Sequence, residues 1–207
     1  CDLLDKASVD ALVAKTRRLG ILVVTAGLSP SMGDGIRIFN VNLPGMAYVL
    51  DAFERILCAD SVAVCFASIA GHIFVPTDSH VLKLIDDPLS PTIVQDLIDV
   101  GVDITDSDAA YGYSKHGVIR LCRKRAAIWG ERGARIMSLS PGIVDTAMGD
   151  LEFRNQPAME DLVAATPLKR VGTAGEVAAA VDFLTSSKAS FITGIDLLVD
   201  GGIISTM

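Results

Sequence analysis

The sequence predicts an α/β fold built around a parallel sheet. Short apolar or β-branched runs without polar alternation, as in parallel strands buried on both faces, occur at residues 21–25, 61–67, 135–140 and 195–199. Between them lie longer stretches with helical periodicity, at residues 8–19, 36–57, 109–132 and 175–186. Alternating strands and helices favour right-handed crossover connections, which keep the strands parallel.

Each predicted strand is a short run, and one helix also has a clear start signal. The strands read, in order, "ILVVT", "SVAVCFA", "RIMSLS" and "IDLLV". The last helix has the pattern of a capping box, with Thr173 as the cap and Glu176 three residues later. The length of 207 residues fits one domain with a full core and is short for two.

Two segments interrupt the alternation. Residues 76–108 form a polar and acidic insertion with helix-like pieces around 81–85 and 93–100. Residues 147–172 follow a predicted strand and contain Pro157 and Pro167. Long excursions after parallel strands commonly form substrate loops, and we favour this role for 147–172. The insertion is equally consistent with a substrate loop and with a surface elaboration or subunit contact.

Composition excludes several function classes. Half of the residues are hydrophobic and 21% are charged, as in globular proteins. A formal net charge of −7 argues against a nucleic-acid-binding protein, since phosphate binding requires clustered cations. We interpret the one basic cluster, residues 120–125, as a helix face that is solvated or faces another subunit, rather than as a phosphate site.

Neither a membrane span nor a metal site is expected. The longest weakly polar stretch, residues 61–75, contains Ser68, Gly71 and His72. It is shorter than the ~20 apolar residues of a membrane helix. The N-terminus carries no signal-peptide pattern. The four cysteines are scattered without a CxxC motif, which fits a reducing cytoplasm, and the three histidines lack metal-ligand spacing.

The stretch "AYGYSKHG" contains a candidate acid/base pair. In a helix, Tyr111 and Lys115 are four residues apart and share one face, whereas Tyr113 lies about 200° from Lys115 around the axis. A neighbouring ammonium favours the phenolate and lowers the pKa of tyrosine from about 10. Tyr111 is therefore a candidate general acid/base, although a Tyr–Lys pair at this spacing also occurs by chance.

Other polar or flexible positions follow the predicted strands. Ser68 ends the run 62–67, and Gly27 follows the strand 21–25. The strand 135–140 is followed by Pro141-Gly142, with Thr146 a few residues later. The carboxyl ends of parallel strands face the crevice in which open α/β sheets bind ligands. These positions are therefore expected to meet at one site.

Taken together, these motifs resemble the short-chain dehydrogenase/reductase family. Seven pieces occur in the family's order: "CDLLD", "VVTAG", "NVNLPG", "FASIAG", "YGYSK", "SLSPGIVDT" and "TGIDLLVDGG". The resemblance implies a Rossmann-type, doubly wound parallel sheet as a single domain over residues 1–207, with NAD or NADP as the cofactor. It also implies an oxidoreductase that interconverts a secondary alcohol and a ketone, with steroid-like or other apolar molecules as the substrates to expect.

The resemblance assigns a role to each matching residue. The catalytic group corresponds to Asn42, Ser68, Tyr111 and Lys115. Tyr111 would exchange a proton with the substrate oxygen, and Ser68 would hydrogen-bond that oxygen. Lys115 would lower the pKa of Tyr111 and bind the nicotinamide ribose. Asn42 would hold a water that connects Lys115 to solvent. The resemblance gives Tyr113 no catalytic role, so Tyr113 would line the pocket or pack against neighbouring residues.

The cofactor-binding positions are likewise implied by the family pattern. Tyr111 and Lys115 belong to this set as well. Asp2 and Leu3 would lie near the adenine, Thr25, Ala26 and Gly27 along the ribose and phosphates, Pro141, Gly142, Ile143 and Val144 along the nicotinamide, and Thr146 near the carboxamide or a phosphate.

Within the family, "AYGYSKHGVIRLCRKRAAIWGERGARI" and the long insertion before Tyr111 look most like the 3α-hydroxysteroid dehydrogenase/carbonyl reductase group. In that group an insertion at this place alters subunit packing. The family usually assembles into homodimers or homotetramers, in which the helices at 36–57 and 109–132 pack across a two-fold axis.

The sequence also departs from the family pattern. The opening strand and the Gly-rich phosphate turn of the family have no counterpart here, so we expect the sequence to be part of a longer chain. Val24-Thr25 stands where the family usually has two asparagines. An alternative interpretation is therefore a non-catalytic binding or scaffold subunit. A hydrolase using Ser68 as nucleophile is a further alternative, but Ser68 lacks the G-x-S-x-G elbow.

Overall fold

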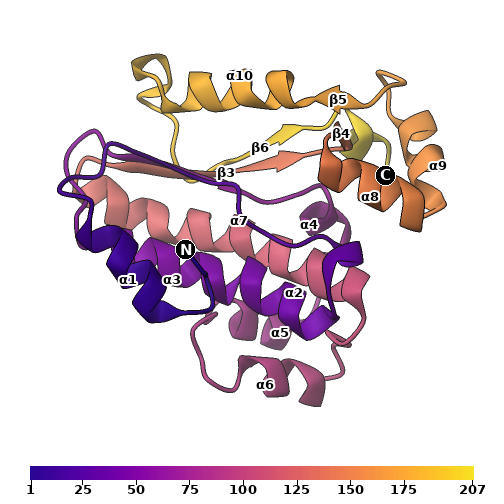
Figure 1. Cartoon of the computed structure of the whole chain (residues 1–207), viewed down its shortest axis with the longest axis horizontal. Coiled ribbons are helices and arrows are strands. Elements are labelled where there is room, and N and C mark those ends of the chain that lie inside the picture. Colours follow the sequence, from indigo (N-terminus) through magenta and orange to yellow (C-terminus); the bar gives the residue numbers. More distant parts are fainter.

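The computed structural model describes residues 1–207 and contains the predicted parallel sheet (Figure 1). Four parallel strands lie in the order β1-β2-β3-β6. Their bounds agree with the predicted runs to within one residue at each end: β1 (Ile21–Val24), β2 (Val62–Phe66), β3 (Arg135–Pro141) and β6 (Asp196–Val199). The predicted Rossmann-like α/β fold is therefore confirmed.

Helices cover the two faces of the sheet unequally (Figure 1). One face carries α1 (Lys6–Ala14), α2 (Gly35–Asn42), α3 (Pro44–Glu54) and the long α7 (Ser107–Glu131), while the other carries α10 (Ala174–Thr185). The segment predicted as one helix over 36–57 is divided between α2 and α3 at Pro44. Proline has no amide hydrogen to continue the hydrogen-bond ladder but suits the first turn of a new helix.

Shorter elements occupy the two interrupting segments and the connections. The insertion holds α5 and α6, which pack as an outer layer beyond α7 and α2 (Figure 1). The short elements are η1 (Pro30–Met32), α4 (Ala70–Ile73), α5 (Ser79–Ile85), α6 (Ile93–Asp99), β4 (Val144–Asp145), α8 (Ala147–Asn155), α9 (Ala158–Ala165), β5 (Gly172–Thr173), η2 (Ser187–Ala189) and η3 (Ile203–Thr206).

The core has a large and a small part, one on each face of the sheet. On the α7 face, Trp129, Phe39 and Ile136 are completely buried together with many aliphatic side chains. The smaller cluster on the α10 face consists of Val62, Val64, Met137, Leu139, Val177 and Leu184. The central strands β2 and β3 are thus buried on both faces, as the sequence predicted.

The prediction of burial on both faces is wrong for the edge strands. In β1, Ile21 and Val23 are 60% and 39% exposed, and in β6 Leu198 is 37% exposed. Ile21 and Val23 pair with Val62 and Val64 and therefore share the α10 face. Because α10 packs over the central strands, it leaves the outer part of this face uncovered.

Three cations of the basic cluster on α7 pair with carboxylates of the same chain. Arg120 forms a bidentate pair with Asp86, both distances being 2.7 Å, and Lys124 lies 3.0 Å from the same carboxylate. Arg125 pairs with Glu54 at 2.9 Å and also with Asp51. Acidic side chains of the neighbouring helices thus cover much of Arg120 and Arg125, where the interpretation as a solvated or subunit-facing face is wrong. The Lys124 side chain is 55% exposed and fits that interpretation.

The structure also bears on the expectations for the cysteines and for a membrane span. All four cysteines are free thiols, and two of them, Cys65 and Cys122, are buried. No helix combines the length and the apolar character needed to cross a membrane.

A buried polar contact joins α4 to the last strand. The Asp196 carboxylate accepts a 2.6 Å hydrogen bond from the Ser138 hydroxyl and lies 2.8 Å from Nε2 of His72. Its side chain is only 3% exposed. We expect Asp196→Ala to lower the free energy of unfolding by about 1–3 kcal/mol, because it leaves a buried hydroxyl and an imidazole without their partner.

Urea unfolding followed by circular dichroism measures this effect. The exposed Asp182 on α10 is a matched control, and Asp182→Ala is expected to stay within about 0.5 kcal/mol of the unmodified protein. Equal stabilities of the two variants would contradict the structural role of Asp196.

Candidate active site

A cavity of about 780 Å³ lies at the carboxyl ends of β1, β2 and β3, where open α/β sheets bind ligands. Its wall combines residues that follow these strands with side chains from the start of α7 and from α8 and α9. Ten predicted site residues line it: Thr25, Gly27, Ser68, Tyr111, Lys115, Pro141, Gly142, Ile143, Val144 and Thr146.

Tyr111 and Lys115 share a helix face, as their spacing predicted. Helix α7 begins after Asp106, whose side chain accepts a hydrogen bond from the amide of Ala109. The Lys115 ammonium lies 5.6 Å from the centre of the Tyr111 ring. Tyr113 instead packs edge-on against Phe74, with ring centres 6.2 Å apart, and contacts the core. Of the two tyrosines, Tyr111 alone lines the cavity.

The expected direction of the Tyr111 pKa is wrong for this structure. Burial raises the pKa of the Tyr111 phenol above its ordinary value of 10. A hydrogen bond with Ser68 opposes this shift, and the charge of Glu152 adds to it. Burial also lowers the pKa of Lys115 to about 8. Loss of hydration on burial is the largest cause of both pKa shifts, and spacing alone could not indicate it.

The Lys115 ammonium has hydrogen-bonding capacity left for a ligand. It donates one hydrogen bond, of 2.9 Å, to the carbonyl oxygen of Phe66 at the end of β2. A lysine ammonium carries three N–H groups. This buried cation in the cavity wall can therefore also donate to hydroxyl groups of a molecule bound in the cavity.

Ser68 lies at the end of β2, and its hydroxyl accepts a 3.2 Å hydrogen bond from the amide of Ala70. The nearby histidines are bonded elsewhere: His72 to Asp196 and His116 Nδ1 to the carbonyl oxygen of Gly71, each at 2.8 Å. Ser68 thus interacts with Tyr111 and not with a histidine base. This arrangement does not support the alternative of a serine hydrolase.

Asn42 is buried behind the cavity wall. Its amide oxygen accepts a 2.8 Å hydrogen bond from Leu28 N, and its amide nitrogen donates one of 2.9 Å to Leu28 O. Asn42 therefore holds the segment that follows β1. A Cβ atom at Gly27 would lie 2.9 Å from Asn42 Oδ1 and 3.3 Å from Lys115 Nζ, so the close approach of these groups requires glycine.

Three predicted cofactor residues lie away from the cavity wall: Asp2, Leu3 and Ala26. Asp2 accepts a 2.9 Å hydrogen bond from the amide of Leu4. Leu3 packs against the main core and lies close to Gly45, where an added Cβ would sit 2.9 Å from that of Leu3. The structure thus brings together the positions predicted for the nicotinamide end and not those predicted for the adenine end.

The sequence analysis missed Glu152, a carboxylate that lines the cavity from α8. Its side chain accepts hydrogen bonds from Ser29 and Ser31, and the residue is 8% exposed. A glutamate in a helix of ordinary composition gives no sequence signal of such burial. The contact depends on the packing of segments more than 120 residues apart.

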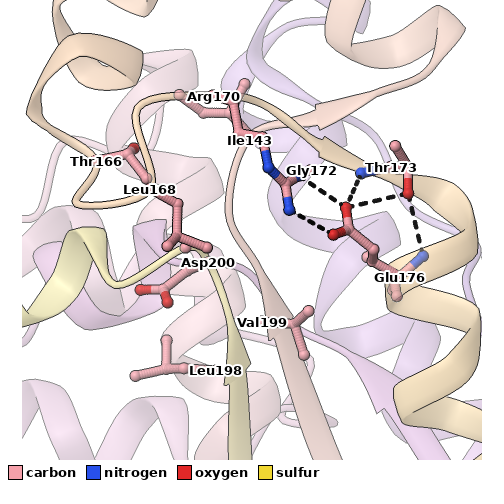
Figure 2. A pocket seen from close by; sticks show the side chains of 12 residues that line it. Ile143, Thr166, Leu168, Arg170, Gly172, Thr173, Glu176, Leu198, Val199 and Asp200 are labelled. Carbon is pink, nitrogen blue, oxygen red and sulfur yellow. Dashed lines mark hydrogen bonds and ion pairs between the residues drawn. The ribbon is translucent and has the colours of Figure 1, made fainter.

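A second, smaller cavity of about 220 Å³ adjoins the start of α10 (Figure 2). Glu176 points towards Arg170 there, with distances of 2.6 and 3.0 Å, and also accepts hydrogen bonds from Thr173 N and Oγ1. The predicted capping box is confirmed, because the Thr173 hydroxyl also accepts from the amide of Glu176. These polar groups satisfy one another and stabilise the start of the helix.

The Glu176 interactions predict a pH-dependent stability. The Arg170 guanidinium and Thr173 hold the pKa of Glu176 at about 2, below the ordinary 4.5. A lowered carboxyl pKa stabilises the folded state above pH 4.5, and this contribution disappears as the pH falls towards 2. We expect Glu176→Gln to lower Tm at neutral pH, with a difference from the unmodified protein that shrinks over this interval.

Thermal unfolding at a series of pH values tests this dependence. The exposed Glu160 on α9 is a suitable control, and Glu160→Gln should leave Tm nearly unchanged at every pH. A Glu176→Gln difference that is constant across the acid range would contradict the proposed origin of the effect.

The fold and the site place this chain among parallel α/β proteins with a tyrosine–lysine pair and a serine at the carboxyl edge of the sheet. The family model described as enoyl-(acyl carrier protein) reductase matches residues 91–204. Over 200 residues the chain is 35% identical to the short-chain dehydrogenase/reductase bsc3 of Alternaria brassicicola, covering 94% of this chain and 73% of that protein. The chain belongs to the short-chain dehydrogenase/reductase family.

Two further similarities agree with the predicted group. The chain is 28% identical to the 3-alpha-hydroxysteroid dehydrogenase/carbonyl reductase of Comamonas testosteroni over 208 residues, which cover 98% of this chain and 79% of that protein. The structure of 3-alpha-hydroxysteroid dehydrogenase from Pseudomonas sp. B-0831 complexed with NADH superimposes with a TM-score of 0.81 at 27% identity. That similarity covers 98% of this chain and 81% of the solved one.

Proposed function

We propose that this protein is an NAD(P)-dependent oxidoreductase that interconverts a secondary alcohol and a ketone on an apolar, steroid-like substrate. The observation that carries the proposal is the convergence of Tyr111, Lys115 and Ser68 on one cavity. The names of the family members with similar sequences and folds support the same class of reaction.

The donor groups of the cavity fit the nicotinamide end of a dinucleotide. Lys115 offers N–H groups to ribose hydroxyls, and the Thr25 and Thr146 hydroxyls lie in the same wall. The segment from Pro141 to Val144 supplies backbone groups at the end of β3. NAD or NADP would supply the hydride or accept it, while the protein contributes orientation and electrostatics.

The side chains of the proposed catalytic group divide the proton chemistry between them. Tyr111 donates its phenolic proton to the carbonyl oxygen in reduction and recovers it in alcohol oxidation. Ser68 donates a hydrogen bond to the same oxygen, where negative charge develops. The Lys115 ammonium, which keeps its proton below about pH 8, stabilises the phenolate that remains.

For Asn42 we propose a supporting role. Its two hydrogen bonds to Leu28 hold the segment that carries Gly27 against Lys115. That Asn42 also holds a water molecule connecting Lys115 to solvent stays a prediction from the family resemblance.

The lining of the cavity favours an apolar substrate. Around Tyr111, the wall contains Ile73, Phe74, Met148, Met159 and Leu162. Most of these residues come from α4, α8 and α9, so the segment 147–172 is suited to the role of substrate loop. Flexible methionines among aliphatic residues adapt to bulky hydrocarbon groups, as steroid-like substrates require.

A spectrophotometric assay tests this function. The purified protein is incubated with NADH and, separately, with NADPH and a panel of ketones that includes steroids, and the reverse reaction uses the matching alcohols. Turnover that requires Tyr111 and not Tyr113 would support the proposal. Absence of turnover with both cofactors across a broad panel would contradict it.

A further inference from the structure

Glu152 is a buried carboxylate in a mostly apolar wall. It lies on α8, is 8% exposed, and lines the cavity together with Met148 and Met159 from the same segment of the chain. A carboxylate in such surroundings is stable only when hydrogen-bond donors satisfy it. The identity of these donors indicates what the residue does.

The donors come from the segment that follows β1. Oε1 of Glu152 accepts hydrogen bonds from the Ser29 hydroxyl at 2.5 Å and from the Ser31 amide at 3.1 Å. Oε2 accepts from the Ser31 hydroxyl at 3.1 Å. Glu152 therefore joins η1, which follows β1, to α8, which follows β4. Hydrogen bonds to a charged acceptor are stronger than those between neutral groups.

A second contact holds α8 one turn later, at its C-terminal end. The side-chain amide of Gln156 donates a 3.0 Å hydrogen bond to Asp108, near the start of α7. Both Gln156 and Asp108 line the cavity, but this contact is exposed to solvent, whereas that of Glu152 is buried. The two contacts hold α8 in the wall of the cavity that Tyr111 also lines, and Glu152 makes the buried one of the two.

We propose that Glu152 is a positioning residue that locks α8 onto Ser29 and Ser31 and so holds the substrate wall and a fixed negative charge beside Tyr111. This inference rests on the proposed function, since the positioned group is the acid/base of that reaction. It adds a residue outside the Asn42, Ser68, Tyr111 and Lys115 set.

The charge of Glu152 has a predictable electrostatic consequence. Charged side chains in the cavity wall are those of Lys115, Asp108 and Glu152. Burial is the main reason why the pKa of Tyr111 is raised, Ser68 opposes it, and Glu152 raises it further. Removing the Glu152 charge therefore lowers the pKa of Tyr111. In alcohol oxidation, where Tyr111 acts as the base, the rise of kcat/KM with pH then occurs at lower pH.

Three variants separate the contact from the charge. Glu152→Gln removes the charge and weakens the contact, whereas the double variant Ser29→Ala/Ser31→Ala removes both hydroxyl donors and keeps the carboxylate. Asp150→Asn, at an exposed carboxylate of the same helix, is the control for charge alone. Circular dichroism confirms that each variant is folded before its kinetics are compared.

We expect both Glu152→Gln and the double serine variant to lower kcat/KM by ten- to about 100-fold, since displacement of a substrate wall disturbs the reacting geometry. The pH profile should move to lower pH only in Glu152→Gln. Asp150→Asn should resemble the unmodified protein in both measurements. If Glu152→Gln gives the rate and pH profile of Asp150→Asn, the proposal is overturned.

Hydrogen exchange measures the contact without any turnover. The Ser31 amide donates to Glu152, so its exchange should become faster in Glu152→Gln and stay unchanged in Asp150→Asn. Unchanged exchange in Glu152→Gln would overturn the proposed contact even in an active enzyme. A third outcome is faster exchange in Glu152→Gln without turnover by any variant or by the unmodified protein. In that case the contact is supported and the proposed function is contradicted.

Discussion

Replacing Tyr111 with phenylalanine is expected to lower kcat/KM for ketone reduction by about 10²–10⁴-fold, the range associated with a positioned general acid. The substitution removes only the phenolic hydroxyl. The ring, with Lys115 5.6 Å from its centre, stays in place. The hydroxyl is the group that interacts with Ser68 and would give its proton to the substrate oxygen. The substitution should therefore lower the rate of the chemical step.

The chain offers a matched control two residues away. Tyr113→Phe makes the same chemical change on the same helix, but the ring of Tyr113 packs against Phe74 and does not line the cavity. We expect this variant to retain most of the activity. Nicotinamide binding, followed by fluorescence of the reduced cofactor, should remain similar in both variants. Retained turnover in Tyr111→Phe would exclude Tyr111 as the acid/base.

The largest expected effect on stability is that of Trp129→Ala, with a loss of about 3–5 kcal/mol in the free energy of unfolding. Trp129 is completely buried near the end of α7, within the main core. Its indole N–H donates a 3.2 Å hydrogen bond to Glu54 on α3. The substitution leaves a cavity and removes one of the partners of a carboxylate that also binds Arg125.

Urea unfolding followed by far-ultraviolet circular dichroism measures this loss, because Trp129 is the only tryptophan and its removal abolishes indole fluorescence. The neighbouring residue Ile128 is 46% exposed. Ile128→Ala is expected to cost much less, since it leaves no enclosed space. Comparable losses in the two variants would contradict the assignment of Trp129 to the core.

The features that the sequence predicted correctly depend on short-range order along the chain. The strands are apolar runs, and the pairing of Tyr111 with Lys115 follows from helical spacing within four residues. Ser68, Pro141 and Gly142 come together because parallel strands end at one edge of the sheet. Leu43-Pro44 shows the limit of periodicity, since the apolar pattern continues across a point where proline starts a new helix.

The features that the sequence did not predict depend on packing between segments far apart in the chain. Arg120 and Asp86 are separated by 34 residues, and Ser29 and Glu152 by 123, so their pairing has no local signal. The exposure of the β1 side chains depends on α10 packing over the central strands, and not on the hydrophobicity of β1 itself. The direction of the Tyr111 pKa likewise depended on burial, which the tertiary structure alone reveals.

The amino-acid sequence by itself determined the order of strands and helices, the family and the tyrosine–lysine pair, because backbone periodicity and short motifs are local properties of the chain. Only the tertiary structure decided which of these groups lose water and which distant side chains meet. Groups lose water, and distant charges pair, when segments far apart in the chain pack together. For this reason Glu152 and the raised pKa of Tyr111 emerged only with the fold.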